Sequence, residues 1–74
     1  AITSAEAAAQ AFLQTPRTLG EVASFLNDSL AAAERVLRIL HLKGVAVHSF
    51  VDASGIRYTT NLSSINHISL NKYL

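Results

Sequence analysis

Few side chains in this 74-residue sequence could carry out acid–base, nucleophilic or metal chemistry. It has five acidic residues, three histidines and no cysteine. The histidines, His41, His48 and His67, stand apart and lack the partners that a zinc site needs. No serine, histidine and aspartate form a recognisable catalytic motif, and there is no glycine-rich phosphate loop. We therefore expect no enzymatic activity, no metal and no cofactor.

The basic residues remain as the main chemical feature, and their distribution is uneven. The formal net charge is only +1. Residues 1–34 contain four acidic side chains and one arginine, for a net charge of −3, whereas residues 35–74 contain five basic side chains and one acidic one, for +4. Such asymmetry is more informative than the total, because a basic half favours contact with nucleic acid.

The length predicts one domain with a small core, because a chain this short buries only about 60% of its unfolded surface. Twelve alanines raise the helical tendency but limit the number of large core side chains. The lack of cysteine suits a reducing cytoplasm, which is the expected location. No apolar run approaches the roughly 20 residues of a membrane span, and no signal peptide is recognisable. We expect a soluble protein without membrane contact.

Residues 29–44 form the clearest predicted element, a helix. Apolar positions recur at steps of three and four at Leu30, Ala33, Val36, Leu37, Leu40 and Gly44. The opposite face then carries Ala31, Ala32, Glu34, Arg35 and Arg38. Asp28 and Ser29 are suitable N-cap residues, Lys43 suits the last turn, and Gly44 can leave the helix with a positive φ.

Two shorter helices are predicted before it. The first begins at a Thr3–Glu6 capping box and runs to about Gln14, with an apolar stripe of Ala5, Ala8, Ala9, Phe12 and Leu13. Pro16 stops it, and residues 15–18 form an extended link that could pair as an edge strand. The second begins at a Thr18–Glu21 capping box and buries Leu19, Val22, Ala23 and Leu26. The turn formers Asn27 and Asp28 lead directly into the third helix.

After Gly44 the apolar period changes to two, which predicts a β-hairpin over residues 45–60. Residues 52–55 are expected as a four-residue loop, with Gly55 at a positive φ. In the second strand, Ile56, Tyr58 and Thr60 alternate with Arg57 and Thr59, so Arg57 should point outward. Tyr58 and Phe50 are expected in the core or in an interface.

The tail, residues 61–74, fits either a helix or a strand. Its apolar side chains are too many for an idle tail: Leu62, Ile65, Ile68, Leu70, Tyr73 and Leu74. We expect it to pack on the core or to form a dimer contact.

This order of elements resembles a winged helix domain. The segment TLGEVASFLNDSLAAAERVLRILHLKGVAV is similar to bacterial, phage and plasmid winged helix-turn-helix regulators. In these, a threonine-leucine-x-glutamate-hydrophobic-alanine opening leads to a helix that ends in leucine, two residues, lysine or arginine, then glycine. The resemblance covers about residues 5–60. It implies a mainly α, α+β fold, with three helices and a two- or three-stranded wing in a domain of residues 1–60.

The resemblance also implies sequence-specific binding of double-stranded DNA and a role in transcription regulation. A recognition helix at 29–43 would enter the major groove, and a wing at 45–60 would lie on the backbone. Base contacts would come from Ser29, Ala31, Ala32 and Arg35. Phosphate contacts would come from Arg38, Lys43, Arg57, the wing tip at Ser54 and the helix start at Thr18.

The sequence also allows other interpretations of Arg35 and of the function of the domain. The reading face is rich in alanine, and Arg35 could equally be a solvated arginine paired with Glu34. Because so few phosphate contacts bind weakly, the DNA hypothesis requires a homodimer. The alternative is a winged helix used for protein contact, as in the dimerisation modules that precede the catalytic part of small-molecule O-methyltransferases. The chain could also be a fragment of a larger protein.

Overall fold

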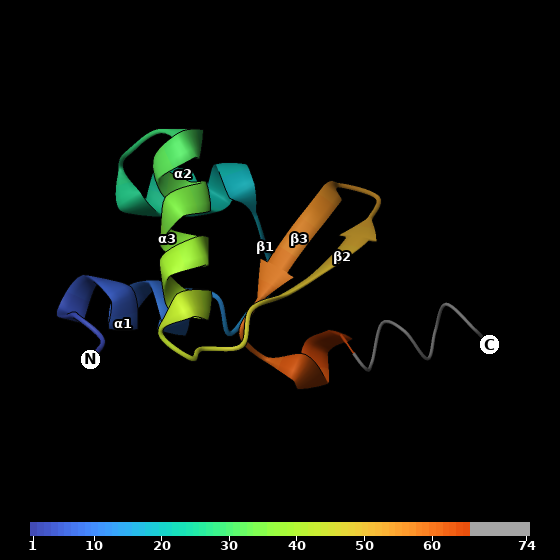
Figure 1. Ribbon diagram of the computed structural model, residues 1–74. Helices are drawn as coiled ribbons and strands as arrows, with labels where there is room; N and C mark the ends of the chain where they lie inside the picture. The colour runs from blue at the N-terminus through green and yellow to red at the C-terminus, as the bar shows by residue number, and fades with distance from the viewer. Residues whose placement is uncertain (66–74) are drawn as a thin grey trace.

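Three helices and a hairpin follow one another in the computed structural model, which describes residues 1–65 (Figure 1). The elements are α1 (Ser4–Phe12), β1 (Arg17–Thr18), α2 (Leu19–Leu26), α3 (Leu30–Leu42), β2 (His48–Asp52) and β3 (Gly55–Thr59). A fourth, short helical turn covers residues 62–65. The predicted α+β class is therefore confirmed. None of the helices in this described part has the length and apolar character that a bilayer crossing requires.

Each main helix begins where the sequence predicts it, because a side chain accepts a hydrogen bond from the first turn. The Thr3 hydroxyl accepts from the Glu6 amide at 3.2 Å, and the Glu6 carboxylate accepts from the Thr3 amide at 2.9 Å. The same reciprocal pair joins Thr18 and Glu21 at 3.2 and 2.8 Å. The Ser29 hydroxyl accepts from the Ala32 amide at 3.1 Å.

The exit from α3 differs in part from the prediction. Gly44 has the expected positive φ, of 91°. The first strand of the hairpin, however, begins at His48 and not at Val45. The reason is that the Val45 amide still donates to the Leu40 carbonyl at 2.9 Å, as part of the helix exit. Val45 and Val47 instead pack against the core.

The strands form one antiparallel sheet in the order β1-β3-β2. The predicted edge strand is confirmed, since Arg17 pairs with Tyr58 and Thr18 with Arg57. Asp52 pairs with Gly55, whose φ is 107°, so the hairpin loop has two residues and the prediction of four was wrong. The Asp52–Gly55 pair thus extends the pairing of β2 with β3 up to a two-residue turn.

Where β3 ends, the expected alternation between inward and outward side chains fails. Thr59 was expected on the outward side, but it is fully buried. Its hydroxyl donates to the Leu13 carbonyl at 2.7 Å, and the Thr60 amide donates to the same carbonyl at 2.9 Å. The C-cap residue of α1 is therefore bonded to the end of β3 through this carbonyl.

The core lies where the three helices meet, with the sheet against it. Its buried members are Ala9, Leu13, Val22, Ala23, Ala33, Leu37 and Leu40. Two expectations for α3 were wrong: Leu30 is 55% exposed and Ala32 only 8% exposed. Ala32 lies one turn before the half-buried Val36, and the neighbouring elements cover this edge of the helix and leave the Leu30 edge open.

The tail is only partly described. Leu62 is 51% exposed, and Ile65 is half-buried. The predicted contacts of Ile68, Leu70, Tyr73 and Leu74 lie outside the described residues, as does His67.

Candidate nucleic-acid interface

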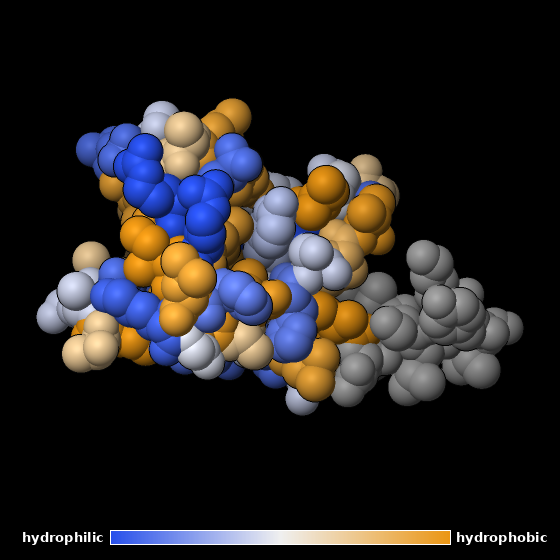
Figure 2. Space-filling view, viewed as in Figure 1, coloured by the Kyte–Doolittle hydropathy of each residue, from blue (hydrophilic) through white to orange (hydrophobic). Residues whose placement is uncertain are grey.

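The side of α3 that faces away from the core is mixed in character, as Figure 2 shows. We call it the outer face of α3, and its exposed residues are Leu30, Ala31, Glu34, Arg35, Arg38, His41 and Leu42. Within residues 1–65, Arg35 and Arg38 form no ion pair. The alternative pairing of Arg35 with Glu34 is therefore not observed in this range. Both guanidinium groups can therefore bind an anionic partner without breaking an ion pair within residues 1–65.

Of the four residues expected to contact bases, three lie together and one does not. Ser29, Ala31 and Arg35 are exposed at the N-terminal end of the outer face. The Ser29 hydroxyl uses an acceptor site for the cap and keeps its own proton for donation. Ala32 is buried, so its methyl group cannot lie on a reading face and that assignment was wrong.

Lys43 is exposed at the end of α3, but its ammonium group is engaged. Its Nζ lies 2.7 Å from Oε1 of Glu6 in α1. The Lys43 ammonium and the Thr3 amide together hold the pKa of Glu6 below its ordinary value of 4.5. A phosphate contact by Lys43 would have to compete with this pair.

The strand alternation predicts that Arg57 points outward into solvent, and this prediction was wrong. Its side chain is 22% exposed, with Nε 2.6 Å from Oδ2 of Asp52 and Nη1 3.3 Å from Oε1 of Glu21. Nη1 also donates to the Pro16 carbonyl at 3.3 Å. Partial burial raises the pKa of Asp52, but the Ser54 amide and the Arg57 guanidinium outweigh it and leave that pKa below 3.8. Arg57 thus joins the hairpin to β1 and α2.

Thr18 and Ser54 are likewise committed to local structure. The Thr18 hydroxyl caps α2, and its amide donates to the Glu21 carboxylate, which occupies the place expected for a phosphate. The Thr18 amide, against partial burial and with help from Arg57, keeps the pKa of Glu21 below 4.5. Ser54 is exposed at the hairpin tip, and its amide donates to Asp52 at 2.8 Å.

Exposed apolar side chains are the first feature that the sequence reasoning missed. Leu42 is 76% exposed on the outer face of α3. Val51 and Ile56, cross-strand partners near the hairpin tip, are 71% and 54% exposed, and apolar atoms gather at this end of the hairpin in Figure 2. The period-2 pattern marked these strands as half-buried but did not show that the core ends before their tip.

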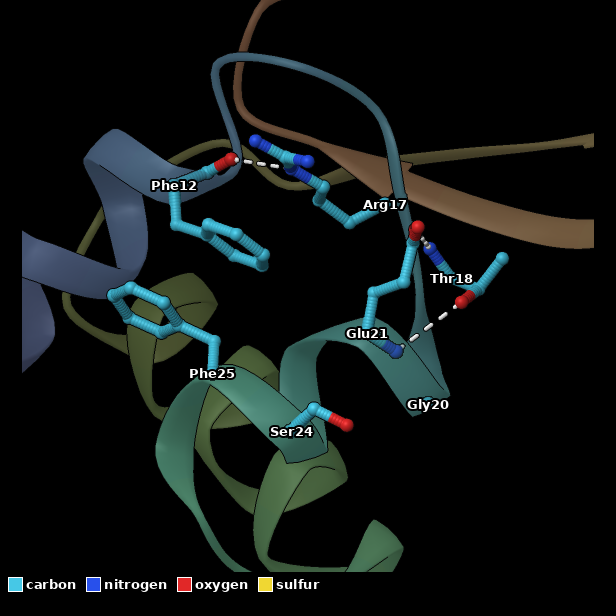
Figure 3. Close-up of a pocket in the computed structure, with 7 residues that line it drawn as sticks. All are labelled: Phe12, Arg17, Thr18, Gly20, Glu21, Ser24 and Phe25. Atoms are coloured by element: carbon cyan, nitrogen blue, oxygen red, sulfur yellow. Dashed lines mark hydrogen bonds between the residues drawn. The ribbon is translucent and has the colours of Figure 1, made fainter.

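A hollow beside α2 is the second missed feature (Figure 3). We call it the α2 hollow; its volume is about 560 Å³, and it is lined by Phe12, Arg17, Thr18, Gly20, Glu21, Ser24 and Phe25. Because α2 buries Val22 and Ala23 toward the core, the hollow lies on the side of the helix that faces away from it. The available signal was Phe25, a large aromatic residue that falls outside the apolar stripe of α2.

Comparisons with known protein families, with curated proteins and with solved structures found no match for this chain. In the described residues, no three His, Asp or Glu side chains lie together as a metal site would require.

Proposed function

We propose that this protein is a winged-helix DNA-binding protein that places the outer face of α3 in the major groove of double-stranded DNA. The order of helices and strands and the sheet order β1-β3-β2 are compatible with that fold. β2 and β3 project from the helices as a hairpin, the place of a wing (Figure 1). The wing then lies on the DNA backbone beside the recognition helix.

One observation carries this proposal: Arg35 and Arg38 are exposed, lie about one turn apart and have no acidic partner within residues 1–65. A guanidinium group can donate two parallel hydrogen bonds to guanine O6 and N7 or to a phosphate. Arg35, near Ser29 and Ala31, is suited to base contact, and Arg38 to the phosphate backbone. Lys43 and Arg57 are already paired and contribute less.

Two copies of the chain are required for useful affinity. The two arginines on the outer face of α3 neutralise few phosphates, so a single copy binds weakly at physiological salt. A homodimer on two half-sites doubles the contacts and links them through one assembly. Such a protein would act as a transcription regulator.

The test is binding to labelled duplex DNA, measured by fluorescence anisotropy at about 50 mM salt, where the electrostatic contribution is large. Sites are first selected from a randomised duplex pool. We expect the wild type to bind a selected site and Arg35→Gln/Arg38→Gln to lose about tenfold or more in affinity. Arg17→Gln, which removes one positive charge from β1 and none from α3, is the control and should bind nearly as the wild type does. No wild-type binding at this salt concentration would refute the proposal.

A second candidate function, protein contact through α3, is favoured by the exposed leucines. Leu30 and Leu42, 55% and 76% exposed, flank the arginines on the outer face. Small and apolar side chains there would permit close approach of another helix. If this function holds, Leu42→Ser disrupts an assembly seen by light scattering without DNA, whereas the double arginine variant leaves the assembly intact.

A further inference from the structure

The orientation of Arg17 in the α2 hollow is fixed by two contacts. Its Nε donates to the Phe12 carbonyl at 3.1 Å, and its guanidinium carbon lies 4.0 Å from the centre of the Phe12 ring. No ion pair within residues 1–65 uses Arg17. Its terminal amino groups therefore have a set direction and no ion-pair partner in this range, although the charge of Arg17 contributes to the lowered pKa of Glu21. A planar guanidinium held in this way matches a carboxylate, which accepts two parallel hydrogen bonds.

The aromatic side of the hollow provides a flat apolar surface. The rings of Phe12 and Phe25 stack with centroids 4.2 Å apart and an interplanar angle of 10°. Figure 3 shows the Phe12 ring between the Arg17 guanidinium and the Phe25 ring. Phe25 stays 44% exposed, although aromatic surface is favourably removed from water. Arg17 covers one face of Phe12 and Phe25 covers the other, so an apolar group in the hollow would meet the edge of Phe12 and the exposed part of Phe25.

The opposite side of the hollow leaves room for such a group. Glu21 lines it, but its carboxylate accepts from the Thr18 amide at 2.8 Å and pairs with Arg57 at 3.3 Å, which offsets its charge. The Ser24 side chain lies below, with its hydroxyl exposed (Figure 3). At Gly20 an added Cβ would meet only the Thr18 hydroxyl oxygen, at 3.9 Å. The volume of about 560 Å³ falls within the range of small-molecule sites.

We propose that the α2 hollow binds a small carboxylate with an apolar body. The carboxylate accepts hydrogen bonds from the terminal amino groups of Arg17, and the apolar body packs against the edge of Phe12 and the exposed part of Phe25. Because the residues that line the hollow come from α1, β1 and α2 and not from α3, this site is separate from the DNA surface proposed above and does not depend on it.

The test uses 2-naphthoate as the probe, titrated into the ¹⁵N-labelled full chain and followed by two-dimensional NMR. We expect saturable shifts centred on the amides of residues 12–25, with a dissociation constant of about 0.1 to 1 mM, as suits an open site of this size. The uncharged 2-naphthamide has the same shape and should bind at least about tenfold more weakly, because it lacks the charge-assisted hydrogen bonds to Arg17.

Three variants decide whether the hollow is the site, each first checked for its fold by far-UV circular dichroism. Arg17→Gln should weaken 2-naphthoate binding by about tenfold or more. Gly20→Leu fills the hollow and should abolish binding while keeping the fold, since the position is open and leucine is the better helix former. Arg38→Gln, the matched control on α3, should bind as the wild type does.

Several results would overturn the proposal: no shifts in the wild type, equal affinity for naphthoate and naphthamide, or unchanged binding in Gly20→Leu. The last comparison decides the matter even if Arg17→Gln does not fold. A Gly20→Leu protein that folds but no longer binds supports the assignment.

Discussion

Arg57 and Arg38 belong to the same basic half of the chain, but they differ in burial and in ion pairing. Arg57 lies between Asp52, Glu21 and the Pro16 carbonyl and is 22% exposed. Arg38 is exposed on the outer face of α3, without an ion pair in residues 1–65. The first holds the hairpin to β1 and α2, and the second is available to a partner.

The difference shows that a count of charges overstates the binding surface. Lys43 and Arg57 make up half of the four basic residues between positions 35 and 65, and both are paired with acids from the acidic half of the chain. The opposite charges of the two halves therefore serve the fold in part. Among the basic residues between positions 35 and 65, those on the outer face of α3 are the ones without such partners in this range.

The largest expected effect is on stability. Arg57→Ala removes the group that joins Asp52, Glu21 and Pro16, and should lower the free energy of unfolding by about 1–3 kcal/mol. Arg38→Ala should change it by less than about 0.5 kcal/mol. Urea denaturation followed by circular dichroism measures both. Equal losses in the two variants would contradict the distinction between paired and available arginines.

The next effect is the salt dependence of DNA binding. Each phosphate contact contributes about −0.9 to the slope of log affinity against log salt. If Arg38 is the one charged phosphate contact, the slope is about −0.9 per bound copy; if Lys43 and Arg57 leave their acids to join it, the slope is about −2.7. We expect the smaller slope, with Lys43→Gln leaving it unchanged. Anisotropy titrations from about 50 to 200 mM salt give the answer.

A smaller effect concerns Glu21, which Thr18 and Arg57 share. Thr18→Ala removes the N-cap of α2 and should lower the free energy of unfolding by about 1 kcal/mol. Combined with Arg57→Ala, the total should be less than the sum, because both substitutions loosen Glu21, one at its amide and the other at its carboxylate. Thr3→Ala is the matched control, since its partner Glu6 does not touch Arg57, and its cost should simply add to that of Arg57→Ala. Additive costs in both double variants would show that Glu21 does not couple the two sites.

The smallest effect is expected at low pH. The pKa values of Glu21 and Asp52 lie below their ordinary values of 4.5 and 3.8, so the ionised forms stabilise the fold. This contribution is complete above the unfolded values and is lost as the pH falls through the lower folded values. Thermal melts should be flat above about pH 5 and decline below about pH 4. Arg57→Ala should show a shallower decline, and an unchanged pH profile would count against its role.

Much of the fold could be predicted because its signals are local. Thr3 with Glu6, Thr18 with Glu21, and Ser29 mark helix starts through contacts within three residues, and Gly44 and Gly55 mark turns by their positive φ. These geometries need no distant partner. The α+β order followed from them and from the change of apolar period after α3.

The candidate site was harder to predict. Helical periodicity identified the buried stripe of α3, but it could not say which edge the neighbours cover. It therefore placed Leu30 inside and Ala32 outside, the reverse of what is observed. The α2 hollow was missed because Phe12, Arg17 and Phe25 come from three different elements.

The sequence by itself determined where the helices begin, where the chain turns and that its basic residues follow its acidic ones, since each depends on neighbouring residues or on composition. Only the tertiary structure decided which basic groups are available. Glu6 meets Lys43 across 37 positions and Glu21 meets Arg57 across 36, and these pairs form only because packing brings α1 against α3 and the β1–β3 register brings the hairpin to α2. Arg35 and Arg38 remain available because no acidic element within residues 1–65 packs over the outer face of α3.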